Sequence, residues 1–225
     1  MAAIPAPRRP NPLLRLGVSI AERTVGKRLE PARLLAWYPK AALGFGLMES
    51  LVAHHDGRLD KRLLQVVRLV ASFAVGCRFC IDLNGMGRER NQLTDEEVRA
   101  VARLAGGQEP NWPDSVSELA RLAARYAAVL SATPTLPDEV LAEVNAVFTP
   151  REVVVLATTS AQVNAWARLI RGLGVAPAGF SDTCEIATHG WAQVRAAQRG
   201  EARRGGHRSP GHRGTRGGLV RGDRR

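Results

Sequence analysis

Two cysteines three residues apart, Cys77 and Cys80, are the residues of this sequence best suited to chemistry. In such a pair one thiolate can attack an oxidant while the other resolves the product as a disulfide. The only other cysteine among the 225 residues is Cys184. Such an odd, small number argues against a disulfide framework and favours a reducing cytoplasm, where a Cys-x-x-Cys pair is more often redox-active or metal-binding. Two cysteines that merely pack in the core are the alternative.

The segment around the pair predicts that both cysteines stand at the start of a helix. An apolar helical run ends at Gly76, and a new helix is expected to begin at Cys77. Thiols in the first turn lie at the positive end of the helix dipole, which favours the thiolate form. Arg78 acts in the same direction, whereas Asp82 opposes it. We interpret Asp82 as a solvated acid of the first turn.

The elements that must position this segment are almost all helical. Capping boxes of the form Thr/Ser-x-x-Glu stand before apolar-periodic runs at Thr94, Ser115 and Thr149. Pro137 and Pro150 also mark helix starts, since proline is tolerated in the first turn. These signals predict an all-α protein with helices over residues 31–55, 59–75, 77–91, 95–105, 114–131, 137–147 and 150–172.

The positive charge is concentrated at the two ends of the chain. The formal net charge is +11, of which residues 195–225 carry +8 and residues 1–15 carry +3, so the remainder is neutral. A nucleic-acid-binding domain ordinarily carries its basic patch on the folded part. Residues 191–225 are rich in Arg and Gly and hold no aromatic residue after Trp191. We interpret them as a disordered tail rather than a nucleic-acid-binding arm.

The residues around the cysteine pair resemble a known family. The stretch from Leu59 to Arg90, with Gly76-Cys77-Arg-Phe-Cys80-Ile-Asp at its centre, is similar to the carboxymuconolactone decarboxylase-like superfamily that includes alkylhydroperoxidase D (AhpD). A second match runs from Thr149 to Val175 and resembles the last helix of that family. Together the matches span about residues 35–180. The resemblance implies an AhpD-like helical bundle with the Cys-x-x-Cys at a helix N-terminus.

The resemblance also implies the roles of individual residues. In AhpD-like members the second cysteine reacts with peroxide and the first resolves it, which assigns these roles to Cys80 and Cys77. The family's proton relay has a glutamate twelve residues before the first cysteine and a histidine four residues after the second, and this sequence has Gln65 and Asn84 there. Neither amide titrates near neutral pH, so the relay is incomplete, although both amides can form hydrogen bonds.

The activity implied is that of a thiol-dependent oxidoreductase that reduces hydroperoxides through a Cys77/Cys80 dithiol–disulfide cycle. The alternative is a non-peroxidase member of the family, weakly active or binding a small molecule, and with less support a lactone decarboxylase. The resemblance implies a homo-oligomer, a trimer or a multiple of it, with an external dithiol reductant and no bound cofactor. Three regions are expected: an N-terminal extension over 1–30, the AhpD-like domain over 31–190 and the tail over 191–225.

Several other residues are candidates for the site. Glu49, His54 and His55 could supply the missing acid or base, although both histidines also suit a helix C-terminus, where the dipole favours positive charge. Trp166 and Arg168 could line a pocket near the cysteines, or pack elsewhere. A zinc site would need Cys184 and His189 as further ligands, at a spacing wider than short zinc modules use, and we expect no metal. No run approaches the roughly 18 apolar residues of a membrane span, and no secretory signal or membrane partner is expected.

Overall fold

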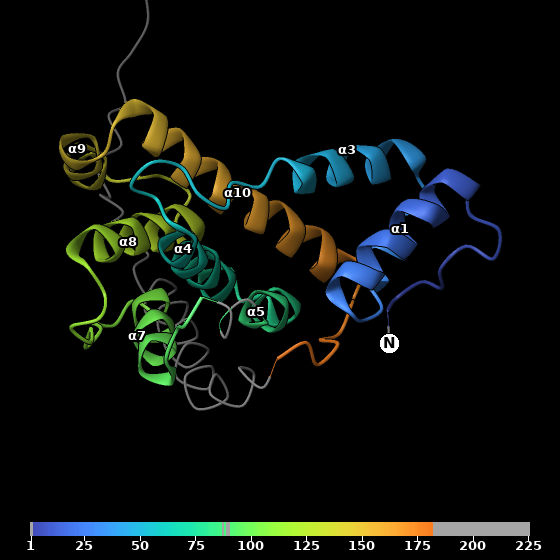
Figure 1. Cartoon of the computed structure of the whole chain (residues 1–225), viewed down its shortest axis with the longest axis horizontal. Helices are drawn as coiled ribbons and strands as arrows, with labels where there is room; N and C mark the ends of the chain where they lie inside the picture. Colours follow the sequence, from blue (N-terminus) through green and yellow to red (C-terminus); the bar gives the residue numbers. More distant parts are fainter. Residues whose placement is uncertain (1, 87, 89–90, 182–225) are drawn as a thin grey trace, which may run out of the picture.

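The computed structural model describes residues 2–86, 88 and 91–181, and this part of the chain is helical, with no strand (Figure 1). The all-α prediction is therefore confirmed. The predicted disordered tail over 191–225 lies outside the described residues. The helices are α1 (Pro12–Val25), α2 (Glu30–Leu35), α3 (Pro39–Ser50), α4 (Lys61–Ala74), α5 (Arg78–Gly85), α7 (Asp95–Ala105), α8 (Glu118–Ala132), α9 (Asp138–Val147) and α10 (Pro150–Gly172).

Helix α4 is the centre of the fold. It packs against α5, α7, α8 and α10, and Figure 1 shows it between these helices. Every residue from Leu63 to Ala74 is buried, which a surface helix with a single apolar stripe could not achieve. The core formed around it draws large apolar side chains from several helices, including Leu64, Leu69, Phe73, Ile81, Val98, Val101, Val144 and Leu156.

Two of the three predicted capping boxes are confirmed. Thr94 caps α7 and Thr149 caps α10, each with reciprocal hydrogen bonds to the glutamate at the third helical position. The third prediction, at Ser115, is wrong because Ser117 caps α8 instead. The Ser115 hydroxyl donates to Glu97 Oε1 at 2.6 Å. The serine is thus used for a contact between elements rather than for the start of a helix.

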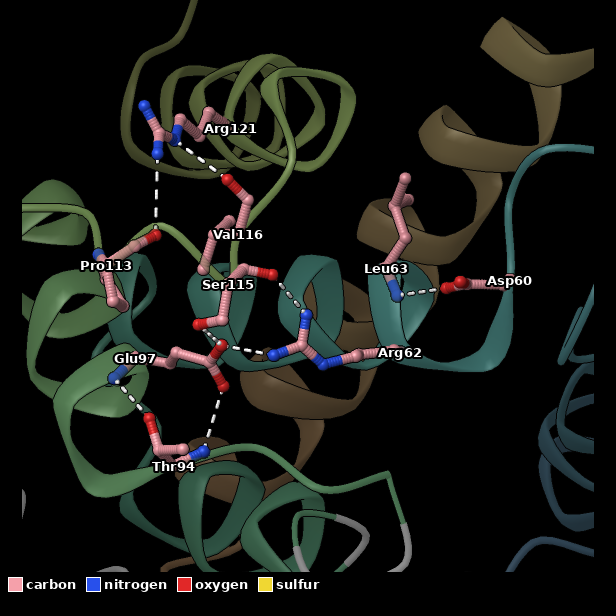
Figure 2. Close-up of polar contacts among 9 residues, drawn as sticks. All are labelled: Asp60, Arg62, Leu63, Thr94, Glu97, Pro113, Ser115, Val116 and Arg121. Atoms are coloured by element: carbon pink, nitrogen blue, oxygen red, sulfur yellow. Dashed lines mark hydrogen bonds and ion pairs between the residues drawn. The ribbon is translucent and has the colours of Figure 1, made fainter.

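A buried ion pair joins the N-terminal turn of α4 to that of α7 (Figure 2). The Glu97 side chain is 1% exposed, and its carboxylate accepts hydrogen bonds from Arg62, from Ser115 and from the backbone of Thr94. Arg62 also donates to the Ser115 carbonyl at 2.8 Å. With its carboxylate saturated in this way, Glu97 can be buried without a large penalty. The pair fixes α4 and α7 relative to the segment before α8.

A second ion pair ties the segment before α4 to the start of α10. Arg58 contacts Glu152 through two nitrogens, at 3.0 and 2.7 Å, and also donates to the Val147 carbonyl. The Arg58 hydrogen bond and the Thr149 backbone amide lower the pKa of Glu152 to about 2. The segment before α4 and the first turn of α10 are thereby held together.

The predicted helix over 31–55 is wrong, because two helices and a loop occupy that range. Pro39 has no amide hydrogen and disfavours helical backbone at Tyr38, whose φ of −129° and ψ of 90° are extended. Helix α2 therefore ends at Leu35, and α3 begins afresh at Pro39 and ends at Ser50.

Two further helices differ from the sequence prediction. The helix predicted over 77–91 ends at Gly85, where a Gly-Met-Gly sequence has poor helix propensity. Helix α1 was not predicted, yet Asn11 caps it, Pro12 starts it and Gly26 ends it in a left-handed conformation, with a φ of 78°. Within the described ranges, no helix has the length and apolar character needed to cross a membrane.

Candidate functional site

The cysteine pair stands at the N-terminus of α5, as predicted. Cys77 is the N-cap residue, and its Sγ accepts a hydrogen bond from the Cys80 backbone amide at 3.2 Å. The two cysteines form a disulfide, with their Cα atoms 5.2 Å apart. Both are buried, at 1% and 4% exposure. This arrangement can alternate between a dithiol and a disulfide without moving the backbone far.

The surroundings of the disulfide are apolar and partly aromatic. Cys77 and Cys80 belong to a small buried cluster, separate from the main core, to which α5, α10 and the segment after α10 contribute. Phe79 and Phe180 meet edge to face, with their ring centroids 5.6 Å apart. The other members, buried or partly buried, are Val25, Leu29, Val75, Leu83, Met86, Trp166, Ala167, Ile170 and Val175.

The two relay positions, Gln65 and Asn84, lie together between α4 and α5. The Gln65 side-chain amide donates to the Asn84 backbone carbonyl. The Asn84 side chain donates to the Ser72 hydroxyl at 3.0 Å, and that hydroxyl donates to the Arg68 carbonyl at 2.7 Å. The Ser72 carbonyl in turn accepts from the Cys77 amide at 3.1 Å. A hydrogen-bonded chain therefore leads from the relay positions to the cysteine segment, but it contains no titratable side chain.

Ser72 was not singled out in the sequence, although a fully buried polar residue in an apolar helix could have drawn attention to it. Arg68 is a second buried polar residue of the same helix, at 9% exposure. Its guanidinium donates to the Ala53 carbonyl, and burial lowers the pKa of Arg68, which the charge of Glu49 partly opposes. The position of Arg68 inside an apolar run could have drawn attention to it in the sequence.

Asp82 is not the solvated acid that we predicted. It is fully buried, and its carboxylate accepts three backbone hydrogen bonds from the segment after α10: Ala178 at 2.9 Å, Gly179 at 2.7 Å and Ser181 at 3.0 Å. Because the acceptors of a buried carboxylate must be satisfied, these amides replace the water that the prediction assumed. Asp82 therefore ties that segment to the cysteine helix.

Glu49, His54 and His55, the alternative acid and bases, differ in their surroundings. His54 and His55 are exposed in the loop after α3, four and five residues beyond its end, so their interpretation as helix C-terminal residues is wrong. Glu49 lies on α3 and accepts hydrogen bonds from Gln162 at 2.8 Å and from Trp166 at 3.0 Å. Glu49 thus reaches the cysteine cluster through Trp166, whose ring packs against that cluster.

Trp166 and Arg168, the two residues of α10 considered for a pocket near the cysteines, have different surroundings. Trp166 packs against the cysteine cluster, and its ring centroid lies 4.7 Å from that of Phe45. Arg168 is exposed and donates to Asn164 Oδ1 at 3.2 Å. Of the two, only Trp166 belongs to the surroundings of the disulfide.

The described residues contain no group of three or more His, Cys, Asp or Glu side chains that could hold a metal ion. Cys184 and His189, the further ligands considered for zinc, lie outside the described residues.

Comparisons with known proteins agree with this fold. Residues 41–107, which include both cysteines, match the sequence model of the Carboxymuconolactone decarboxylase family. The match covers less than a third of the chain, and within it the chain is similar to that family. No curated protein matches the sequence.

Two solved structures share the fold. One is the alkylhydroperoxidase AhpD core, an uncharacterized peroxidase-related protein from Ralstonia eutropha JMP134, with a TM-score of 0.63, 17% identity and coverage of 81% of this chain and 93% of that chain. The other is the debrominase Bmp8 in complex with 2,3,4-tribromopyrrole, with a TM-score of 0.62, 16% identity and coverage of 84% of this chain and 91% of that chain. Identities this low show a shared fold, and a shared fold does not establish a shared reaction.

Proposed function

We propose that this protein is a dithiol-dependent oxidoreductase that reduces hydroperoxides by cycling Cys77 and Cys80 between dithiol and disulfide. The observation that carries the proposal is the placement of both sulfurs at the N-terminus of α5, with Cys77 Sγ accepting the Cys80 amide. The positive end of a helix stabilises a thiolate there, and the thiolate is the reactive form.

In the proposed cycle the Cys80 thiolate attacks the terminal oxygen of the hydroperoxide. The O–O bond breaks, the alcohol leaves with a proton, and Cys80 becomes a sulfenic acid. Cys77 then attacks that sulfur, a disulfide forms and water leaves. An external dithiol reduces the disulfide through a mixed disulfide and is itself oxidised. A reducing cytoplasmic compartment would supply such a donor.

The hydrogen-bonded chain through Gln65 and Asn84 contains no general acid or base, and we therefore expect the reaction to be slow. The amides hold α4 and α5 in register near the sulfurs, but they neither take the thiol proton nor deliver one to the leaving alkoxide. General acid–base catalysis contributes typically about 10²–10⁴-fold, so a site without it retains thiolate chemistry at a lower rate.

The direct test is oxidation of the fully reduced protein by one equivalent of cumene hydroperoxide, followed by peptide mapping. We expect cumyl alcohol and a Cys77–Cys80 disulfide to appear together. A Cys184→Ser variant is the matched control and should react like the wild type. Unchanged thiols in the presence of the hydroperoxide would contradict the proposal.

The second candidate function is thiol-dependent removal of bromine from a small aromatic compound. Two observations favour it: the apolar, aromatic surroundings of the disulfide and the fold shared with a debrominase bound to 2,3,4-tribromopyrrole. In this reaction the carbon–bromine bond breaks, bromide leaves, the carbon takes a proton and the two thiols are oxidised to the disulfide. Bromide release from 2,3,4-tribromopyrrole with dithiothreitol, by a protein that leaves cumene hydroperoxide unchanged, would favour this candidate over the first.

A further inference from the structure

Both cysteines of the redox pair are almost completely covered in the structure. Cys77 is 1% exposed and Cys80 is 4% exposed. A thiolate attacks a hydroperoxide only when the reacting atoms come within about 3–3.5 Å of each other. Some member of the apolar cluster around the cysteines must therefore give way to the substrate, and that member defines where the substrate binds.

Phe180 is the aromatic member of this cluster that stands outside a helix. Of the three aromatic rings in the described part of the cluster, Phe79 belongs to α5, Trp166 to α10, and Phe180 to the irregular segment that follows α10. Figure 1 shows this segment, in orange, returning from the end of α10 towards α5. Moving a helix disrupts its packing against the core, whereas an irregular segment opens locally at a smaller cost.

A single side chain of the cysteine helix, Asp82, holds this segment in place. Ala178 and Gly179 donate their backbone amides to Asp82 Oδ2 at 2.9 and 2.7 Å, and Ser181 donates its amide to Oδ1 at 3.0 Å. Gly179 has a φ of 70°, and this left-handed conformation lets two successive amides converge on one oxygen. The Ser181 hydroxyl also donates to the Asp82 carbonyl at 3.0 Å. These contacts fix Phe180, which lies between the bound amides, against the cysteine helix.

The Phe180 ring lies at the boundary between the cluster and solvent. Its buried neighbour is Phe79, whose ring meets it edge to face at a centroid distance of 5.6 Å. Its exposed neighbour is Lys27, whose Nζ lies 5.9 Å from the ring centroid and also donates to the Gly179 carbonyl. A ring edge and a cation both attract an aromatic face. The space that the Phe180 ring fills, which we call the aryl subsite, therefore suits another aromatic ring equally well.

We propose that the aryl subsite binds the aromatic ring of the substrate when Phe180 moves out. Resting on the proposed function, this assignment narrows the substrate class to hydroperoxides that carry an aryl group beside the peroxide. The substrate ring takes the place of Phe180 against Phe79 and Lys27, which leaves the peroxide group free to reach Cys80. An apolar cavity of this size stays dry and binds benzene-like molecules. A ring thus recovers the apolar burial that the displacement of Phe180 loses, whereas an aliphatic group recovers less.

Phe180 competes with the substrate for the aryl subsite. In the wild type the subsite is free only in the fraction of molecules whose segment after α10 has opened, and the apparent affinity is reduced by that fraction. Phe180→Ala removes the competing ring but keeps the backbone amides that bind Asp82. The variant should therefore take up an aromatic ring more readily than the wild type.

The first experiment follows alkylation of Cys80 by iodoacetamide in the fully reduced protein, with and without cumene, an aryl compound that has no peroxide group. We expect Phe180→Ala to be alkylated about tenfold faster than wild type or more, as removal of a buried phenyl group gives, and cumene to slow the alkylation of this variant. Phe148→Ala is the matched control, since Phe148 is buried in the main core rather than in the cysteine cluster, and cumene should not protect its Cys80. Phe180→Leu, a smaller truncation, should show both effects more weakly and replaces Phe180→Ala if that variant does not fold.

The second experiment compares cumene hydroperoxide with tert-butyl hydroperoxide, in which a methyl group replaces the phenyl ring. The rate constants for oxidation of reduced Phe180→Ala are divided by those for free dithiothreitol, which has no binding site. We expect this corrected ratio to favour cumene hydroperoxide by about tenfold or more, because only its ring fills the aryl subsite.

The outcomes separate the aryl subsite from the peroxidase function. Alkylation of Phe180→Ala that cumene does not slow would overturn the subsite. Equal corrected rates for the two hydroperoxides would also overturn it, while the proposed function would stand. If cumene protects Cys80 but neither hydroperoxide oxidises it, the subsite is supported and the peroxidase function is refuted.

Discussion

Cys77 caps the helix that carries Cys80, with its sulfur 3.2 Å from the Cys80 backbone nitrogen. One residue thus supplies both a helix cap and half of the redox pair. Negative charge on the Cys77 sulfur is stabilised by this amide and by the helix dipole, so Cys77 is the favoured leaving group when a donor thiol attacks Cys80. This polarity agrees with the roles implied by the family resemblance, in which Cys80 meets the substrate.

Restoring the proton relay should raise the peroxidase rate. Gln65→Glu combined with Asn84→His introduces two titratable groups at positions that already touch through the Asn84 carbonyl. We expect the rate of hydroperoxide consumption with a dithiol donor to rise by about tenfold or more, as gaining a general base or acid typically gives. Gln108→Glu is the control, since Gln108 is an exposed residue in the segment after α7. An unchanged rate in the double variant would indicate that the site serves another reaction.

Asp82 should matter for stability far more than its place in a first turn suggests. Asp82→Asn replaces one carboxylate oxygen by an NH₂ group that faces backbone amides, and we expect it to lower the free energy of unfolding by about 2 kcal/mol. Asp95→Asn, at a half-exposed residue of α7, should cost less than about 1 kcal/mol. Urea unfolding measures both. Equal effects of the two substitutions would show that the contacts between Asp82 and residues 178–181 contribute little.

The Arg62–Glu97 pair in Figure 2 should be strongly coupled. Glu97→Gln removes the buried carboxylate that accepts from Arg62, whose side chain is 33% exposed, and should cost about 2 kcal/mol. The matched substitution Glu118→Gln breaks the pair with Arg121 at a glutamate side chain that is 88% exposed, and should cost less than about 1 kcal/mol. Chemical denaturation compares the two. The double variant Arg62→Met/Glu97→Leu is compared with the single variants Arg62→Met and Glu97→Leu. If the loss of unfolding free energy in the double variant equals the sum of the losses in the two single variants, the two residues are not coupled.

Glu152 should contribute an acid-dependent part of the stability. Its pKa is lowered to about 2 in the folded protein, chiefly by Arg58, so its ionised form stabilises the fold at pH values above the ordinary range of a glutamate. That contribution is lost as the pH falls from about 4.5 towards 2. The difference in unfolding free energy between wild type and Glu152→Gln should therefore shrink over this interval. A difference that stays constant between pH 6 and pH 2 would contradict the assignment.

Much of the fold could be predicted because its signals are local. The capping residues of α7 and α10 are read from four consecutive residues, and α7 and α10 begin and end where the sequence predicted. The break before Pro39 was also a local signal, but the apolar pattern over 31–55 outweighed it. The cap of α8 was misplaced by two residues because Ser115 is used by Glu97, a residue distant in sequence.

The candidate site likewise has one part that the local sequence predicts and another part that depends on tertiary packing. The cysteine pair and its place at a helix N-terminus follow from the sequence and from the family resemblance. The role of Asp82 does not, because its partners are nearly a hundred residues away and only the packed structure brings them together. The link from Glu49 through Trp166 to the cysteine cluster likewise depends on how α3 lies against α10.

The most direct test of the central claim is hydroperoxide turnover with a dithiol donor, comparing wild type with Cys80→Ser. Cumene hydroperoxide consumption is followed at fixed donor concentration, with Cys184→Ser as the control for removal of a thiol. We predict that Cys80→Ser falls to the uncatalysed rate while Cys184→Ser retains the wild-type rate. Equal rates in wild type and Cys80→Ser would contradict the assignment of the cysteine pair as a peroxidase site.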